Sequence, residues 1–165
     1  MKLSFLFLAI ALLGSQARAQ NVAIDSISHE RVLIGPVELS AFQDSSWFRS
    51  NYSLYNPEAE LIHQIDSLSP GDSVSVVFGS WCPDSHMWVP MFLSIMDRTS
   101  LAHKIGYIAV PESSGWRDEL TPGLHIKRVP TFIFYHNGTE IGRIIEEPKG
   151  DIGKNIVDIL KAGAR

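Results

Sequence analysis

Cys82 is the only cysteine in the 165-residue sequence, and its neighbours are of types that support thiol chemistry. An apolar run over residues 76–78 leads through Gly79 to Trp81, and Pro83 directly follows the cysteine. Pro83 suits the first turn of a helix, where its missing N–H has no intrahelical partner to lose. We therefore expect Cys82 at a strand-to-helix junction. There the unpaired amides and the positive end of the helix dipole favour a thiolate.

The next side chains act on that sulfur in different ways. His86 lies one helical turn further on the same side, where its protonated ring would favour the thiolate; a solvated surface histidine fits the pattern equally well. Asp84 would disfavour the thiolate by like-charge repulsion. Ser85 cannot resolve a disulfide, because an alcohol is neither an attacking nor a leaving group in this exchange. We expect an exposed, reactive sulfur, and an inert buried cysteine is the alternative.

Hydrophobic patterning predicts the elements that position this junction. Strands are expected at residues 74–78, 104–110, 132–135 and 141–145, and helices after Cys82 and over 151–162. Asn137-Gly138 predicts a hairpin turn between the last two strands. The order strand, helix, strand implies a right-handed parallel crossover, to which the hairpin adds. With helices on both faces of the sheet, the predicted fold is a three-layer α/β sandwich with a mixed central sheet.

Residues 20–70 form an N-terminal extension that we expect to pack on a domain of residues 71–165. A short strand at 31–34 is predicted to stop at Gly35-Pro36. Asn56 and Pro57 have the types that begin a helix, here over 57–69. Packing on the core is favoured over a ligand platform for five aromatic residues: Phe42, Trp47, Phe48, Tyr52 and Tyr55.

The first nineteen residues are predicted to be a secretory signal. Lys2 precedes an apolar run, and Ala17-Arg18-Ala19 has the A-x-A pattern of a cleavage site. The run is short for a membrane span, so we expect no stable membrane anchor and an exported, periplasmic or secreted product. Cleavage changes the net charge from −4 to −6, since the segment holds Lys2 and Arg18 and no acid. This acidic balance argues against nucleic-acid binding.

The order of elements and several motifs resemble the thioredoxin superfamily over about residues 70–163. The family's Trp-Cys-x-x-Cys turn is similar to Trp81-Cys82-Pro83-Asp84-Ser85. Pro90 lies where the family has a helix-kinking proline, and Val129-Pro130-Thr131 resembles its cis-proline loop. The closing hairpin looks most like exported thioredoxin-like proteins of Bacteroidetes-type bacteria. Two positions depart from the family pattern. Ser85 replaces the resolving cysteine, and Val76 replaces a buried aspartate that assists resolution.

The resemblance implies that the loop with Val129 and Pro130 lies beside Cys82 and pairs with an extended substrate chain. It favours a monothiol protein that forms mixed disulfides with a disulfide- or thiol-containing protein or a glutathione-like thiol, without net dithiol reduction. The alternative is a non-catalytic binding module that recognises its partner through Trp81, Val129 and Pro130. We expect no cofactor and no metal, because the six histidines lack ligand spacing and no second cysteine exists.

Overall fold

The computed structural model describes residues 21–113, 115 and 117–164. The predicted secretory signal and Trp116 therefore lie outside the described residues. The strands are β1 (Val22–Ile24), β2 (Arg31–Leu33), β3 (Gly35–Val37), β4 (Asp72–Phe78), β5 (Ile105–Ala109), β6 (Thr131–His136) and β7 (Thr139–Ile145). The helices are α1 (Ser46–Tyr52), α2 (Ala59–Leu68), α3 (Pro83–Met96), α4 (Arg117–Leu120) and α5 (Ile152–Gly163), with 3-10 turns η1 (Leu39–Ala41) and η2 (Ser100–Lys104).

The centre of the fold is a five-stranded mixed sheet in the order β3-β5-β4-β6-β7. Strands β4 and β5 are parallel, joined through α3, whereas β3, β6 and β7 each run antiparallel to their neighbours. The β6–β7 turn has Asn137 at φ 49° and Gly138 at φ 81°, the left-handed angles that the Asn-Gly pair tolerates. The predicted crossover and hairpin are both confirmed.

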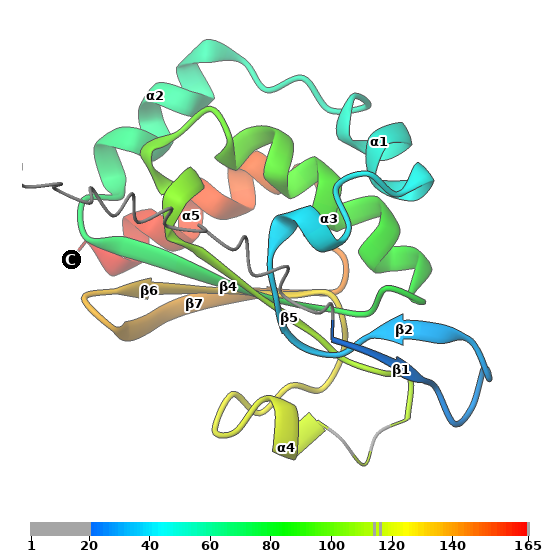
Figure 1. Ribbon diagram of the computed structural model, residues 1–165. Helices are drawn as coiled ribbons and strands as arrows, with labels where there is room; N and C mark the ends of the chain where they lie inside the picture. The colour runs from blue at the N-terminus through cyan, green and yellow to red at the C-terminus, as the bar shows by residue number, and fades with distance from the viewer. Residues whose placement is uncertain (1–20, 114, 116, 165) are drawn as a thin grey trace, which may run out of the picture.

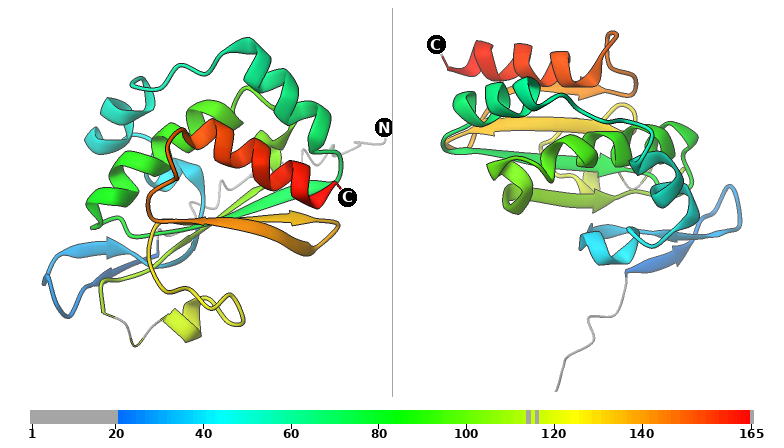
Figure 2. Two further views of the ribbon diagram at one scale, coloured as in Figure 1. Left: turned by 180° about the vertical axis from the view of Figure 1, so that it is seen from behind. Right: turned by 90° about the horizontal axis from the view of Figure 1, so that it is seen from above.

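The two faces of the sheet are covered unequally. Helices α1, α2, α3 and α5 all lie over one face, and α4 with the connection to β6 lies over the other (Figures 1 and 2). The predicted α/β layering is thus confirmed, with a thick helical layer on one side and a thin layer opposite. None of the described helices is long and apolar enough to cross a membrane.

Alternation along the strands divides the core into two clusters. Val76 and Phe78 of β4 and Phe132 of β6 pack beneath the helices. Val77 of β4 points the other way, into a smaller cluster that contains Cys82. Successive side chains of a strand face opposite sides, so a strand of nearly continuous apolar residues serves both clusters. Cys82 therefore belongs to the thinly covered face.

The N-terminal extension supplies an edge strand to the central sheet. The predicted short strand ends at Leu33, before Gly35-Pro36 as expected, but the sequence did not predict that a second strand, β3, begins at Gly35 and pairs with β5. Gly35 has φ 71°, which lets the chain turn from the β1–β2 pair into the larger sheet. Pro36 is tolerated there because an edge strand has one unpaired side.

Helix α2 begins two residues later than predicted. Its N-cap is Glu58, not Asn56. The side-chain oxygen of Asn56 instead accepts a hydrogen bond from Arg98 at 3.0 Å, so it is directed to the end of α3 and not to its own helix. The aromatic residues of the extension pack inward as expected. Phe42 is 3% exposed, and its ring lies 4.8 Å from that of Phe78.

A buried carboxylate fastens the β1–β2 hairpin to the loop after β5. Asp25 is 1% exposed, and its oxygens accept hydrogen bonds from the backbone N–H groups of Ile27, Ser28 and Glu112 at 2.7–3.0 Å. Burial by itself would raise the pKa of Asp25, but these backbone hydrogen bonds outweigh burial and hold the pKa below its ordinary value of 3.8. The hairpin is thereby held against the carboxyl end of the central sheet.

Replacing this carboxylate tests the anchor. In Asp25→Asn the amide N–H₂ would face a second donor, the N–H of Glu112, so we expect a lower melting temperature at neutral pH. A lowered folded-state pKa stabilises the fold fully above pH 3.8, and this stabilisation is lost as the pH falls through the lowered value. The difference between wild type and variant should therefore shrink in acid. Glu30→Gln, an exposed acid of the same hairpin, is the control; a pH-independent difference for Asp25→Asn would contradict the anchor.

Candidate functional site

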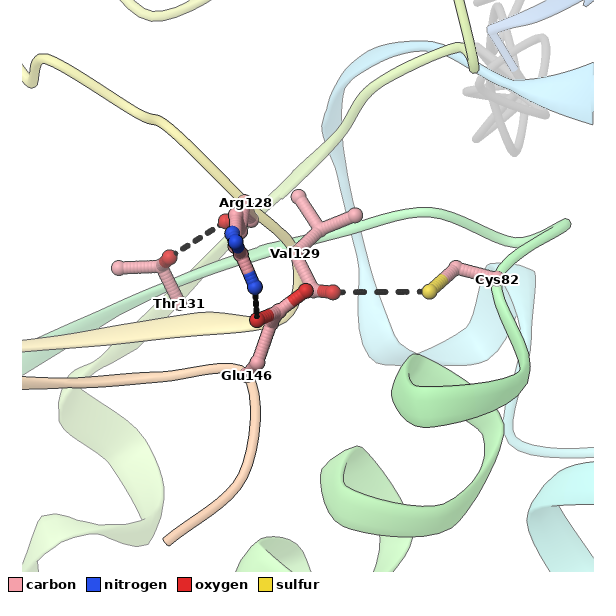
Figure 3. A network of polar contacts seen from close by, with 5 residues as sticks. All are labelled: Cys82, Arg128, Val129, Thr131 and Glu146. Carbon is pink, nitrogen blue, oxygen red and sulfur yellow. Dashed lines mark hydrogen bonds and ion pairs between the residues drawn. The ribbon is translucent and has the colours of Figure 1, made fainter.

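Cys82 occupies the N-cap position of α3, with Pro83 in the first turn, as the sequence predicts. Its Sγ donates a hydrogen bond to the carbonyl oxygen of Val129 at 3.5 Å, and the peptide bond between Val129 and Pro130 is cis. Figure 3 shows the sulfur directed at this carbonyl across the gap between α3 and the loop before β6. Cys82 and the Val129–Pro130 loop, 47 residues apart, therefore form one site.

The expected exposure of the sulfur is wrong. Cys82 is only 6% exposed and belongs to the cluster on the thinly covered face, with five buried apolar neighbours: Val77, Val110, Ile126, Val129 and Ile133. The reason is the Val129–Pro130 loop, which covers the helix N-terminus and accepts the S–H. A carbonyl can only accept a hydrogen bond, so this contact stabilises the protonated thiol.

The Val129–Pro130 loop is fixed on both sides. Thr131 Oγ1 donates to the carbonyl of Arg128 at 2.6 Å, and the N–H of Glu146 donates to the carbonyl of Pro130 at 2.7 Å. The guanidinium of Arg128 also pairs with the Glu146 carboxylate (Figure 3). The loop is thus held by contacts that do not involve Cys82.

The side chains of Trp81 and Ser85 bond to backbone groups and not to the sulfur. The indole N–H of Trp81 donates to the carbonyl of Val110 at 2.9 Å, at the end of β5. Ser85 is fully buried, and its Oγ accepts the N–H of Gly79 at 3.1 Å. The hydroxyl at the resolving position therefore closes the loop that precedes Cys82.

Of the other predicted site residues, some lie on the surface and one contacts the backbone of the loop before Cys82. Pro83 and Asp84 are exposed on the first turn of α3. His86 is half-buried, and its Nε2 lies 2.7 Å from the carbonyl oxygen of Ser80. Its ring stacks on Trp47 with centroids 4.5 Å apart. The imidazole is thus directed to the loop backbone and not to the sulfur, which differs from both interpretations offered by the sequence.

Residues of the extension complete the site, and sequence reasoning missed them. The N–H of Leu33, the last residue of β2, donates to Ser80 Oγ at 3.0 Å, and Trp47 of α1 stacks on His86. Nothing local in the sequence marks these contacts, because each joins residues at least 39 positions apart. Val76, at the position of the family's buried aspartate, is fully buried among apolar side chains under the helices. Among the described residues, no group of three or more His, Cys, Asp or Glu side chains is arranged to hold a metal ion.

Comparison with known proteins places the chain in a structural class. A protein of unknown function from Pseudomonas aeruginosa superposes with a TM-score of 0.54 at 14% identity, over 79% of this chain and 94% of the other. The thioredoxin of Malassezia sympodialis is 29% identical over 84 residues, which are 50% of this chain and 77% of that protein. Thioredoxin f2 of Chlamydomonas reinhardtii covers 63% of this chain with a TM-score of 0.41 and 18% identity. No family model matches the chain.

The class is therefore the α/β proteins with a thioredoxin-like fold, a mixed five-stranded sheet flanked by helices. Within that class the chain is a distant relative of thioredoxin in sequence, and the matched thioredoxin covers about half of it.

The close packing of Gly79 yields a stability prediction. A Cβ at this position would lie 2.7 Å from the Trp81 indole, whose N–H is held by Val110 and cannot move freely. We expect Gly79→Ala to lower the free energy of unfolding in urea by about 1–3 kcal/mol, the usual cost of overpacking. Gly106→Ala in β5 is the matched control, because a Cβ there meets nothing within 4 Å. Equal stability of the two variants would show that Trp81 is not fixed.

The buried hydroxyl of Ser85 yields a second prediction. Ser85→Ala leaves the N–H of Gly79 buried without an acceptor, so we expect a loss of about 1–3 kcal/mol in the free energy of unfolding. Ser67→Ala, at an exposed hydroxyl on α2, should change it by less than about 0.5 kcal/mol. A Ser85→Ala variant as stable as Ser67→Ala would remove the structural role assigned to this hydroxyl.

Proposed function

We propose that this chain is a monothiol thioredoxin-like protein that exchanges disulfides through Cys82. The observation that supports it is the position of the sulfur. Cys82 is the N-cap residue of the 14-residue helix α3, and its sulfur faces the Val129 carbonyl at 3.5 Å. The residue lies at the carboxyl ends of the parallel strands β4 and β5. Ligand sites of open α/β sheets lie outside the carboxyl ends of their strands.

The proposed step is a balanced exchange. Cys82 loses its proton to solvent, and the thiolate attacks one sulfur of a partner's disulfide. The partner's S–S bond breaks, a new S–S bond joins Cys82 to the partner, and the other sulfur leaves with the electron pair and takes up a proton. No net oxidation or reduction occurs in this step. The product is a mixed disulfide between this chain and its partner.

Release of the partner requires a second thiol from outside the chain. Cys82 is the only cysteine, and the Ser85 hydroxyl is engaged with the N–H of Gly79. A thiol of the partner itself, or a glutathione-like small thiol, therefore attacks the mixed disulfide and returns Cys82 to its reduced form. The proposed outcome is isomerisation or removal of mixed disulfides, in support of redox homeostasis, and not net dithiol reduction.

The proposed partner is an extended, disulfide-containing protein segment. The backbone of Val129 stands beside the sulfur on a fixed loop, where a chain can pair with it as an added strand. Such a segment would bring its own N–H groups to the Val129 carbonyl and compete with the S–H of Cys82 for it. We propose that docking in this way uncovers and frees the sulfur.

The exchange activity can be measured with a scrambled disulfide protein and glutathione. We expect wild type to accelerate recovery of the native protein and Cys82→Ala to show only the background rate. A variant that keeps the sulfur but lacks the buried hydroxyl, Ser85→Ala, should retain activity at temperatures where it stays folded. Equal rates for wild type and Cys82→Ala would contradict the proposed function.

A non-catalytic binding module is the second candidate, and the burial of Cys82 favours it. With 6% exposure and its S–H on a carbonyl, the sulfur has the surroundings of an inert thiol. In that case Trp81, Val129 and Pro130 recognise a partner without covalent chemistry. The two candidates differ in the product formed with a disulfide-containing partner: a mixed disulfide at Cys82 supports exchange, and binding without one supports the binding module.

We also propose that the protein acts outside the cytoplasm. The A-x-A pattern at Ala17-Arg18-Ala19 after an apolar run supports export to the periplasm or the medium. Disulfides persist in such compartments, so a protein that rearranges them would find its substrates there.

A further inference from the structure

The loop that leads into Cys82 is held by side chains from the N-terminal extension. Trp47 of α1 lies flat on His86 of α3, with ring centroids 4.5 Å apart and planes at 14°. The Nε2 of His86 is in turn 2.7 Å from the carbonyl oxygen of Ser80. These contacts form a continuous path from the extension to a residue two positions before the cysteine.

The direction of the His86 hydrogen bond is fixed by its partner. A carbonyl oxygen has no proton to give, so Nε2 must carry the proton and donate it. The stacked indole sets the plane of the imidazole, and the plane sets where the N–H points. Removing the indole would leave the ring free to rotate away from Ser80.

Ser80 is the point at which this path reaches the site. Its carbonyl accepts a hydrogen bond from His86 and its Oγ accepts one from the N–H of Leu33, so its carbonyl and its hydroxyl are both held by other elements. The Sγ of Cys82 lies 3.5 Å from the carbonyl oxygen of Val129, an ordinary length for a hydrogen bond from sulfur. Because Ser80 is two residues before Cys82, a displacement of Ser80 would move the cysteine and alter that contact.

We propose that Trp47 is a positioning residue for Cys82 and acts through His86 and Ser80. The extension is then part of the site and sets the reactivity of the thiol. This inference deepens the proposed function, and its relevance to disulfide exchange rests on that function. Trp47 also packs on Phe42 and Phe48, with centroids 6.0 and 5.9 Å apart, so a purely structural role must be separated from a positioning role.

The test is the rate at which iodoacetamide alkylates the full chain under native conditions. Because Cys82 is the only cysteine, the rate reports on this sulfur alone. We expect Trp47→Leu to accelerate alkylation about threefold or more, in line with the usual strength of an aromatic contact. Trp47→Phe keeps a flat ring over His86 and should restore a rate close to wild type.

A control on the same helix separates positioning from general loosening. The hydroxyl of Tyr52 donates to Asp97 at 2.7 Å and ties α1 to the end of α3, away from Ser80. Tyr52→Phe should leave the alkylation rate unchanged. Equal acceleration by Tyr52→Phe and Trp47→Leu would overturn the proposal.

A double-mutant cycle tests the path itself. His86→Ala removes the donor to Ser80 and should also accelerate alkylation. If Trp47 acts through His86, adding Trp47→Leu to His86→Ala should have little further effect, whereas adding Tyr52→Phe leaves the rate of His86→Ala unchanged. The ring-current shift of the His86 protons, followed by NMR, should be lost in Trp47→Leu and kept in Trp47→Phe. If the accelerations of alkylation by Trp47→Leu and His86→Ala instead multiply in the double variant, the proposal is overturned.

Failure of this inference is distinguishable from failure of the proposed function. Alkylation needs no disulfide substrate, so an inactive protein whose alkylation rate still depends on Trp47 would refute exchange and leave the positioning role intact. An active protein whose alkylation rate does not change in Trp47→Leu would refute the positioning role and leave disulfide exchange intact.

Discussion

The structure depends on how the three residues before Cys82 are held. Gly79 has no room for a Cβ, because the Trp81 indole fills that space, and its N–H ends on the buried Ser85 hydroxyl. Ser80 is bonded through both its hydroxyl and its carbonyl. Backbone that is held in this way fixes the position of Cys82, the N-cap residue of α3. The placement of the sulfur against the Val129 carbonyl follows from that constraint.

The same constraint explains why the thiol is both well placed and covered. A strand with apolar residues on both faces supports one cluster beneath four helices and a second beneath a thin layer, and the sulfur lies in the second. A helix N-terminus favours a thiolate, whereas a low-exposure site with a carbonyl acceptor favours a thiol. A docking partner that donates a hydrogen bond to the Val129 carbonyl in place of the S–H would favour the thiolate.

Local patterns in the sequence were sufficient for the elements and for the helix junction at Cys82. Three features depend only on neighbours in the chain and can therefore be predicted from the sequence: the alternation along the strands, Pro83 after the cysteine, and the Asn137-Gly138 turn. The crossing at Gly35, the burial of Cys82 and the roles of Ser85 and His86 were not predictable in this way. The burial of Cys82 and the stacking of His86 depend on partners that only folding brings near, Val129 and Trp47. The hydroxyl of Ser85 and the imidazole of His86 bond to Gly79 and Ser80, six residues away, in a turn whose geometry the sequence does not show.

The most direct test that the turn before Cys82 is held in place is amide hydrogen exchange at Gly79 and Leu33 in the native protein, followed by NMR. Both N–H groups donate to serine hydroxyls of the Cys82 turn and not to a regular strand or helix partner. The account predicts protection approaching that of the β4 core, because both amides open only when the braced loop opens. Exchange at the rate of an unprotected loop would show that the turn is not held, and the placement of Cys82 described here would fall with it.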